Sequence, residues 1–486
     1  MKKSNSKIAI FGFIWLFGEK CGNQIITFFI TTILARLLTP SIYGTVALIR
    51  VFTSLLSTFI DSGMGVALVQ KKDVDELDFS TLFCFNILFS IIVYFLMFFL
   101  APIIANFYND VNLILTIRVL SLSLILSGIG NILYSYIYRN FLFKKNLGAH
   151  IIANIISGAI GIFLAYKNFG IWALVINILS YRLLSIIFSY TFIQWFPKIQ
   201  FSFERIKYLF NYGSKLLLSK LIDRLFMNIG ALIIGKYYTK SDLALYSKGR
   251  HFPGLIVENI NGAIDGVLFP IMSKEQSSLE TVKNITRMSI IISTYIIMPM
   301  MVGLAIIAEP LVRLLLTEKW IECVFYLRIA CFTYMFYTIN VTNLNAIKAI
   351  GRSDIFLYLE IIKKIISLIA MSSTLWISVK VFALSGICTC IGGQIINSWP
   401  NKKLLNYSYI GQFMDMLPQI LLSVTMGIII YPIKFLKYND PITIMLQIII
   451  GGLFYISASV ILKIEGFEYL KFKVKNVFPK DIKIFR

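Results

Sequence analysis

Long runs without a charged residue constrain the fold of this chain more than any other feature. Residues 79–109 contain no Asp, Glu, Lys or Arg, and neither do residues 442–462. A hydrocarbon core about 30 Å thick needs roughly 20 apolar residues in a helix. Because lipid offers the backbone no hydrogen-bond partners, each such run is expected to be a helix, and the alternating pattern of barrel strands is absent. The sequence therefore predicts an all-α polytopic membrane protein.

The composition agrees with this prediction. The chain is 58% hydrophobic and 14% charged, whereas soluble domains carry about 25% charged residues. Apolar runs of sufficient length predict about fourteen transmembrane helices. They lie near residues 9–34, 43–67, 80–106, 113–137, 148–166, 170–193, 214–235, 243–271, 288–309, 323–347, 355–377, 381–399, 415–433 and 442–462. Charges within the spans at 214–235, 243–271 and 355–377 mean that a fixed hydropathy threshold should miss them.

The distribution of Lys and Arg predicts the orientation. With the N-terminus inside, most basic residues of the connections fall on the cytoplasmic side, as the positive-inside rule requires. Both termini are then expected to be cytoplasmic. The net charge of +22 follows from this topology and favours contact with anionic lipid. It does not indicate nucleic-acid binding.

An internal repeat organises the chain. "LARLLTPSIYGTVALIR" at residues 34–50 is matched by "IGKYYTKSDLALYSKGR" at residues 234–250. An even number of spans separates the copies, so they are expected to be parallel repeats about an axis along the membrane normal. The aligned cations are Arg36 with Lys236, Arg50 with Arg250 and Lys20 with Lys220.

The duplication predicts the domain organisation. Residues 196–213, between the two copies, carry Phe and Leu among cations. This composition suits an amphipathic segment on the membrane surface. The expected parts are a first lobe at residues 1–195, an amphipathic cytoplasmic linker at 196–213, a second lobe at 214–400, two further spans within 401–463 and a basic cytoplasmic tail at 464–486.

Two motifs carry a resemblance to a known family. The turn "ARLLTPSIYGTVAL" and the segment "FIDSGMGVALVQ", with the layout of two six-span repeats plus two helices, resemble the Wzx-like polysaccharide flippases. These belong to the multidrug/oligosaccharidyl-lipid/polysaccharide exporter superfamily, and the colanic-acid and teichuronic-acid exporter branch is the most similar. The resemblance covers nearly the whole chain and implies a V-shaped pair of six-helix lobes around a cavity that opens alternately inward and outward.

The resemblance also implies a function. Such a protein would move undecaprenyl-pyrophosphate-linked oligosaccharide across the bacterial cytoplasmic membrane for O-antigen, capsule or exopolysaccharide synthesis. Its expected partners are the lipid-linked glycan, membrane lipids and the polysaccharide polymerase machinery. Two alternatives stay open: a cation-coupled multidrug antiporter of the same superfamily, and a membrane glycosyl polymerase or ligase. An antiporter for organic cations would favour an acidic cavity, and a polymerase would favour a large outer loop.

Charges within the spans support an anionic substrate independently. Such charges are costly in lipid and usually face a cavity or a partner, and here the basic ones predominate. The span charges are Glu19, Lys20, Arg50, Asp61, Arg118, Arg182, Lys220, Asp223, Arg224, Lys248, Arg250, Glu258, Asp265, Arg328, Glu360, Lys363 and Lys364. A pyrophosphate offers several oxygens to Arg and Lys. The candidate substrate-binding cations are Lys20, Arg50, Lys220, Arg224, Lys248 and Arg250, and the candidate coupling or ion-pair acids are Asp61, Asp223 and Asp265.

Structural roles compete for several of these residues. Arg50, Lys248 and Arg250 lie near span ends, where they can extend to the headgroups. Lys220, Asp223 and Arg224 have helical spacing that allows them to neutralise one another. Structural roles are also possible for four other cations. Arg118 and Arg328 can serve as ions internal to each lobe, and Lys363 and Lys364 can pair with Glu360.

Signals for an enzyme are weak. Asp73 and Asp75 form a D-x-D pattern, but their loop is too short to hold a nucleotide domain, so a solvated charge run is expected. His150 and His251 have no nearby ligand set, and no phosphate-binding loop of the GxxxxGK[ST] type occurs. The sequence predicts no catalytic activity, no metal and no cofactor.

Overall fold

The computed structural model describes residues 2–61, 64–71, 73–436 and 438–477. For some residues in these ranges, including Lys20 and Asp265, it describes the backbone and not the side chain. The described chain is helical, and no strand occurs in it. It divides into two compact units, Met1–Ala244 and Leu245–Arg486.

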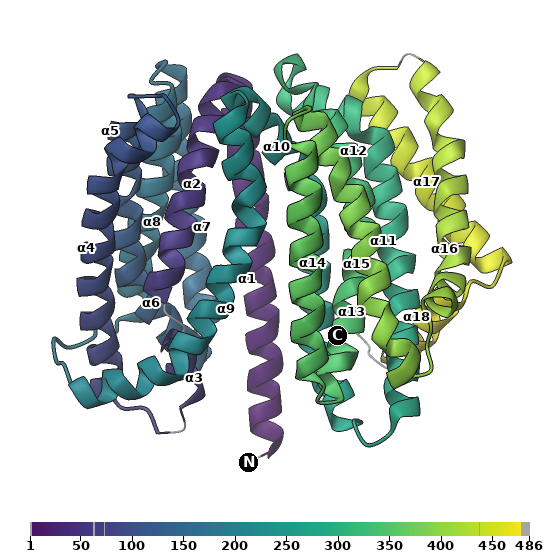
Figure 1. Cartoon of the computed structure of the whole chain (residues 1–486), viewed down its shortest axis with the longest axis horizontal. Coiled ribbons are helices and arrows are strands. Elements are labelled where there is room, and N and C mark those ends of the chain that lie inside the picture. The colour runs from purple at the N-terminus through teal and green to yellow at the C-terminus, as the bar shows by residue number, and fades with distance from the viewer. Residues whose placement is uncertain (1, 62–63, 72, 437, 478–486) are drawn as a thin grey trace, which may run out of the picture. The chain divides into compact units, whose positions relative to one another are not determined.

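The N-terminal unit is a bundle of helices that run alongside one another (Figure 1). Its elements are α1 (Lys2–Leu37), α2 (Pro40–Asp61), α3 (Met64–Gln70), α4 (Glu76–Phe107), α5 (Leu113–Leu120), α6 (Leu122–Asn140), α7 (Phe143–Tyr166), α8 (Ile171–Ile193), α9 (Phe203–Tyr237) and the start of α10 (Lys240–Lys274).

The C-terminal unit is a second helical bundle. Its elements are the rest of α10, α11 (Leu279–Leu316), η1 (Glu318–Trp320), α12 (Cys323–Met335), α13 (Tyr337–Ala349), α14 (Ser353–Thr374), α15 (Val379–Leu404), α16 (Tyr409–Ile430), η2 (Tyr431–Leu436), α17 (Asp440–Ile461) and α18 (Glu465–Val477).

Ten helices or consecutive helix pairs of the described chain are long and apolar enough to cross a membrane. They are α2, α4, α5 with α6, α7, α8, α11, α12 with α13, α15, α16 with η2, and α17. The charged helices α9, α10 and α14 are not among them, as the sequence indicated for the spans that they contain. The ten candidate spans, taken with α1, α9, α10 and α14, are compatible with fourteen spans. That count stays a prediction.

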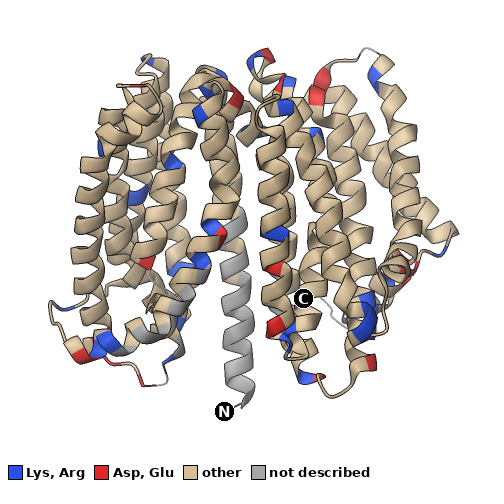
Figure 2. Ribbon diagram, viewed as in Figure 1, with Lys and Arg blue, Asp and Glu red and all other residues tan. Residues whose placement is uncertain are grey.

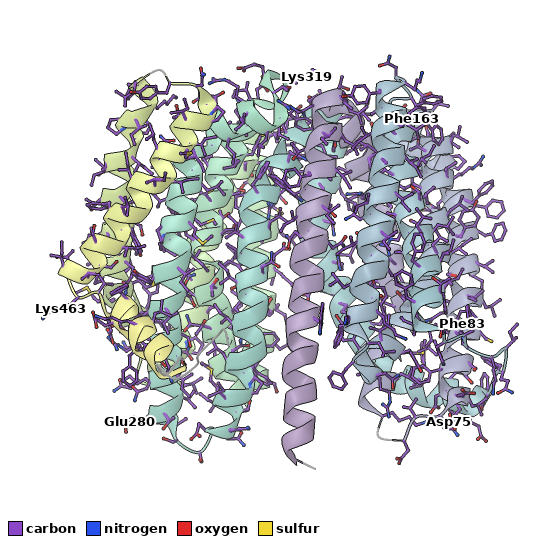
Figure 3. All side chains as sticks on the ribbon, turned by 180° about the vertical axis from the view of Figure 1, so that it is seen from behind. Asp75, Phe83, Phe163, Glu280, Lys319 and Lys463 are labelled. Carbon is purple, nitrogen blue, oxygen red and sulfur yellow. The ribbon has the colours of Figure 1, made fainter. Side chains whose placement is uncertain are left out.

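Charged residues gather at the helix ends of each unit, and a few lie along the middle of the helices (Figure 2). Within the N-terminal unit, Asp75 and Phe163 lie at opposite ends (Figure 3). Within the C-terminal unit, Glu280 and Lys319 do the same. The connections therefore alternate between the two ends of each bundle, as a chain that crosses the membrane repeatedly requires.

Corresponding helices of the two units are interrupted in the same way. The span at 113–137 is divided between α5 and α6, and the span at 323–347 is divided between α12 and α13. Arg118 donates through Nε to the carbonyl oxygen of Phe98 at 3.4 Å, and Arg328 donates through Nε to that of Ala305 at 3.1 Å. Each arginine thus links its own helix to the preceding span of its unit, which agrees with the expected structural role and with an internal duplication.

The expected linker contributes to the core of the N-terminal unit. In Figure 1 the first turns of α9 lie across the lower end of the helices before α9 continues alongside α2. Ile206 and Leu209 are buried against α3, α4 and α6, whereas Phe203 and Phe210 are exposed. One face of the segment packs on protein and another presents aromatic rings, which suits a membrane surface.

The compact units do not coincide with the domain boundaries expected from the repeat. α9 contacts α2, α3 and α4, and the division falls between Ala244 and Leu245. The repeat was inferred from sequence similarity between the two halves, and the compact units do not test it. The two lobes therefore stay a prediction. Part of the expected basic tail is the helix α18, which is joined to α11 by an ion pair of 2.6 Å between Arg287 and Glu465.

The D-x-D segment has a structural role that its sequence did not indicate. Asp73 is exposed, as a solvated charge run predicts, but Asp75 caps α4 by accepting from the backbone N–H of Asp78. The buried carboxylate of Asp78 contacts Lys71 at 2.6 Å and Arg205 at 3.0 Å, and Arg205 also contacts Asp75 at 3.0 Å. Asp75 is itself exposed, as a solvated charge run predicts, whereas the burial of Asp78 departs from that expectation, because its ion pairs close the connection between α3 and α4 onto the start of α9.

Candidate functional site

A group of charges along the spans of the N-terminal unit surrounds Asp61, the last residue of α2. Asn131 of α6 donates to the Asp61 carboxylate at 2.7 Å. Lys220 and Arg224 of α9 and Arg182 of α8 all act electrostatically on this carboxylate. Three helices, α6, α8 and α9, thus bring three cations and an amide to one acidic group at the end of α2, and the sum of these charges is positive.

A cavity of about 370 Å³ lies beside this group. Asp61 and Lys220 line it, and neutral polar residues supply the rest of its polar wall: Asn86, Asn131, Tyr134, Ser135 and Tyr138. The side-chain oxygen of Asn86 is buried and has no hydrogen-bond partner in the described chain.

Arg182 extends the basic surface from Asp61 toward Arg50. It acts electrostatically on both residues, and the side chains of Arg50, Arg182, Lys220 and Arg224 are all exposed. The structure therefore brings Arg182, which was expected only as a charge within a span, together with three of the expected substrate-binding cations. The signal for Arg182 was its position within an apolar run.

A hydrogen-bonded chain of side chains supports the wall of this cavity. His150 of α7 contacts the hydroxyl of Tyr134 at 2.8 Å and that of Tyr181 at 2.9 Å. Asn23 of α1 donates to Tyr181 at 3.1 Å and accepts from Asn154 at 2.6 Å. These contacts join α1, α6, α7 and α8 and fix the position of the Tyr134 ring. The sequence offers His150 no set of metal ligands, and nothing in the sequence predicts this positioning role.

The other expected site residues are distributed differently. Arg250 reaches a separate cavity within the C-terminal unit, whereas Lys248 lies over the ring of Trp320 at 5.9 Å. Lys363 is paired with Glu360 at 2.5 Å, which is one of its two expected roles. Asp223 is exposed beside Arg224 on α9. The side chains of Lys20 and Asp265 lie outside the described residues, and no group of three or more His, Cys, Asp or Glu with metal-binding geometry occurs in the part that is described.

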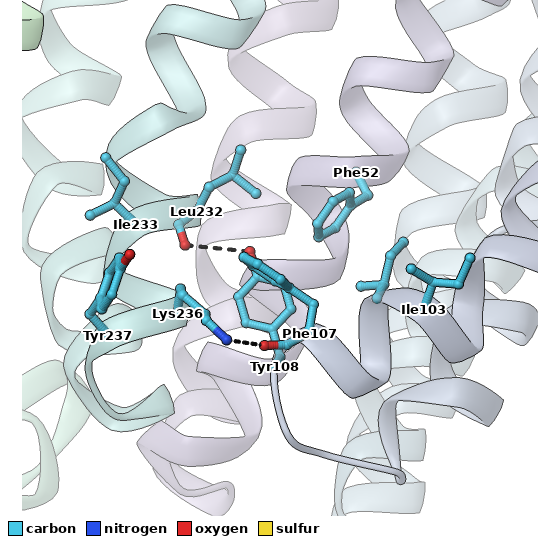
Figure 4. Close-up of a pocket in the computed structure, with 9 residues that line it drawn as sticks. Phe52, Ile103, Phe107, Tyr108, Leu232, Ile233, Lys236 and Tyr237 are labelled. Atoms are coloured by element: carbon cyan, nitrogen blue, oxygen red, sulfur yellow. Dashed lines mark hydrogen bonds between the residues drawn. The ribbon is translucent and has the colours of Figure 1, made fainter.

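A further cavity of the N-terminal unit is apolar (Figure 4). It has about 420 Å³ and lies between α2, α4 and α9. Its lysine, Lys236, donates to the carbonyl oxygen of Phe107 and lies 4.2 Å from the Phe107 ring. Tyr108 donates to the carbonyl oxygen of Leu232 at 3.4 Å. Because these polar groups are engaged, the cavity is poorly suited to an anion.

An apolar groove of about 450 Å³ lies in the C-terminal unit. It is formed by α10, α11, α16 and α17, and its lining is mostly aliphatic. Gly303 of α11 and Gly452 of α17 line it, and a Cβ added at either position would meet no atom within 4 Å. The missing side chains leave the groove open to a flexible apolar chain.

The helices and the site together define a multi-pass membrane protein that holds a basic polar cluster among its spans. A family profile for polysaccharide biosynthesis proteins matches residues 33–325. The chain belongs to this family, and the resemblance noted from its motifs is confirmed.

Curated relatives of this chain act in polysaccharide synthesis. Teichuronic acid biosynthesis protein TuaB of Bacillus subtilis (strain 168) is 25% identical over 390 residues, which cover 77% of this chain and 78% of the relative. Lipopolysaccharide biosynthesis protein WzxC of Escherichia coli (strain K12) is 23% identical over 341 residues, which cover 68% of each chain.

Solved structures share the fold. Lipid II flippase MurJ in an inward closed conformation has a TM-score of 0.73 at 17% identity, and the match covers 93% of this chain and 99% of that one. An inward-facing multidrug resistance MATE family transporter of the MOP superfamily has a TM-score of 0.56 at 13% identity, and the match covers 83% of this chain and 94% of that one. The all-α fold class predicted from the sequence is confirmed.

Proposed function

We propose that this protein is a flippase that moves a pyrophosphate-linked oligosaccharide on an undecaprenyl carrier across the cytoplasmic membrane by alternating access, for the synthesis of a cell-surface polysaccharide. The observation that carries the proposal is the cation cluster around Asp61 within the membrane spans. Family membership and the names of the relatives support the substrate class, and the fold shared with a lipid II flippase supports the transport step.

The cluster has the chemistry that a pyrophosphate requires. Arg50 and Arg182 offer planar forks of N–H donors, while Lys220 offers a compact charge. A charge at the centre of a bilayer costs about 2.5 to 3.5 kcal/mol on insertion scales, and a bound anion offsets part of that cost. An organic cation would instead be repelled here, which favours the flippase over the antiporter alternative.

The lipid part of the substrate has a matching surface in the C-terminal unit. A polyprenyl chain has no polar group, so it loses nothing by lying against the aliphatic walls formed by α11, α16 and α17. We assign this groove to the carrier chain. The sugar head and the carrier thereby contact surfaces of different polarity, as an amphipathic substrate requires.

Cytoplasmic termini form part of the proposal, because they set the direction of transport. Cysteines placed at Ser41 and Asn439 should react with an impermeant maleimide in intact cells, while cysteines at Asp73 and Ser277 should react only after permeabilisation. Reaction of position 73 in intact cells would contradict the proposed orientation.

The decisive experiment replaces cations of the cluster and measures surface polysaccharide and its lipid-linked intermediate in the host. Lys220→Glu and Arg182→Gln should lower surface polysaccharide at least tenfold and cause the intermediate to accumulate inside, since each removes a charge-assisted contact of about 1.5 to 3 kcal/mol. Lys220→Arg keeps the charge and should retain part of the activity.

Arg352→Gln is the matched control. Arg352 is an exposed cation beside Asp354 at 2.7 Å, outside the cluster, so its replacement should leave polysaccharide export unchanged. Normal export by Lys220→Glu and Arg182→Gln variants at normal membrane levels would overturn the proposal.

A further inference from the structure

A cavity of about 230 Å³ lies within the C-terminal unit, where α10, α12, α14 and α15 meet. Its walls are rich in hydroxyl groups, from Thr333, Ser367, Ser385 and Thr389, and its aromatic residues are Tyr246, Tyr326 and Phe382. Arg250 contributes the charge of this lining, and none of the described residues that line the cavity is acidic. Its volume suits one sugar ring better than an oligosaccharide.

The hydroxyl groups are arranged as acceptors. Thr333 donates to the carbonyl oxygen of Ala330 at 3.0 Å, Ser385 to that of Phe382 at 2.7 Å, and Thr389 to that of Gly386 at 3.1 Å. Each hydroxyl has used its single proton in its own helix, so the oxygen keeps lone pairs for a ligand. A ligand that carries several hydroxyl donors would match this wall.

Arg250 is held in place for a different contact. Its guanidinium donates to the hydroxyl of Tyr246, which lies one turn earlier on α10, and interacts with Tyr334. The Tyr246 ring is fixed by edge contacts with Tyr326 at 5.8 Å and Phe382 at 6.0 Å. These contacts orient the guanidinium while leaving the side chain exposed, so N–H donors remain for an anionic group.

We infer that this cavity is a specificity subsite for a single sugar residue that bears an anionic group, such as a carboxylate or a phosphate. The inference rests on the proposed function, in that the sugar would be part of the transported glycan. The hydroxyl oxygens accept from the ring hydroxyls, the aromatic side chains cover an apolar face of the ring, and Arg250 binds the anion. A neutral sugar of the same shape would leave the remaining N–H donors of the guanidinium without an anion.

The test measures binding of small probes to the purified full-length protein in lipid nanodiscs. The probes are methyl β-D-glucuronide, glucose 1-phosphate and neutral methyl β-D-glucoside, observed by saturation-transfer difference NMR. The wild type should prefer a charged probe over the neutral one by at least tenfold, and the preferred anion identifies a carboxylate or a phosphate as the natural group. Arg250→Gln should reduce this preference to about one, which corresponds to the loss of one charge-assisted contact.

Two further variants separate a specific effect from a folding defect. Thr389→Val keeps the shape but removes an acceptor, so it should weaken charged and neutral probes alike. Arg352→Gln, which replaces an exposed arginine in a connection, should keep the wild-type preference. Equal binding of charged and neutral probes by the wild type, or an unchanged preference in a folded Arg250→Gln protein, would overturn the inference.

Pyrophosphate binding distinguishes this subsite from the proposed function. Inorganic pyrophosphate should lose affinity in Lys220→Gln, while the sugar preference of that variant should persist because Lys220 belongs to the other unit. Loss of pyrophosphate binding together with an intact sugar preference supports both assignments. A sugar preference that disappears in Lys220→Gln contradicts a separate subsite.

Discussion

Gly249 determines how closely α10 approaches α12 in the C-terminal unit. A Cβ at this position would lie 2.7 Å from the carbonyl oxygen of Cys323 and 2.8 Å from the backbone nitrogen of Leu327. Both neighbours are backbone atoms in a helix, so they cannot yield by changing a rotamer. The absence of a side chain at 249 therefore sets the position from which the next residue, Arg250, extends.

Gly249→Ala should separate α10 from α12 and displace Arg250. Overpacking of this kind typically costs about 1 to 3 kcal/mol, so the thermal unfolding temperature in detergent should fall and the preference for charged sugars should weaken. Gly262→Ala is the control on the same helix, because a Cβ there meets nothing within 4 Å. Unfolding temperatures that do not differ between the two variants would contradict the close approach.

Asp75 gives the connection between α3 and α4 a dependence on pH. The backbone N–H of Asp78 donates to its carboxylate and lowers the pKa of Asp75, and the charge of Arg205 acts in the same direction. A carboxylate whose pKa is lower in the folded state stabilises the fold above its unfolded pKa, about 3.9. That contribution is lost as the pH falls through the lower, folded pKa.

Asp75→Ala should therefore lower the stability at neutral pH by about 0.5 to 2 kcal/mol, the range for loss of an N-cap. The difference from the wild type should persist down to about pH 4 and decrease below it. Thermal unfolding followed across this pH range measures the difference. Asp73→Ala removes an exposed carboxylate of the same loop and should change little; an equal effect at position 73 would show that the cap is unimportant.

At the scale of helices, the groove of the C-terminal unit depends on residues that lack side chains. Gly452→Trp would place an indole into the space between α11, α16 and α17. Export of surface polysaccharide should fall severalfold if the carrier chain occupies that space, while insertion into the membrane should persist. Leu453→Trp is the matched control, since Leu453 is exposed on α17 and does not line the groove. Equal export by both variants would show that the carrier chain does not occupy the groove during transport.

Helices were more predictable from the sequence than the site that they build. Apolar runs predicted the spans because a membrane imposes both length and backbone hydrogen bonding. The interruptions near Ser121 and Phe336 carried no Pro or Gly signal, and both divide a span into two helices. The burial of Asp78 at the start of α4 was not predicted, because the sequence does not show that the distant Arg205 packs beside it.

The candidate site was predictable only as an inventory of charges. Position within an apolar run marked Asp61, Arg182 and Lys220 as unusual, and the structure brings these three together. The same criterion did not separate Arg250, which reaches a cavity, from Lys248, which lies over Trp320. Lys248 and Arg250 are two residues apart on α10, so their side chains point to different sides of the helix. Only the packing of α10 decides which side faces a cavity.

At the scale of the whole molecule, transport by alternating access requires contacts that can break. The turn between α9 and α10 is one such place, because within the N-terminal unit it packs against the start of α2. A Cβ at Gly44 would overlap the carbonyl oxygen of Lys240, and the Lys240 ammonium forms an ion pair with Asp110 in the connection after α4. The first contact joins the two turns that the repeat relates to each other, and the ion pair joins the turn between α9 and α10 to the connection after α4.

Cysteines at Ser41 and Ser241 should therefore form a cross-link with a short bifunctional reagent. Ser41 lies one helical turn before Gly44 on α2, and Ser241 follows Lys240, so the close packing of those neighbours brings both positions within reach. If the turns separate whenever the cavity opens outward, the cross-link should stop export of surface polysaccharide, and a reducible linker should allow export to resume after reduction. Each single cysteine variant, treated in the same way, should export normally. Cross-linked protein that still exports would show that these turns stay together throughout transport, and the rocking of one repeat against the other would then be wrong for this chain.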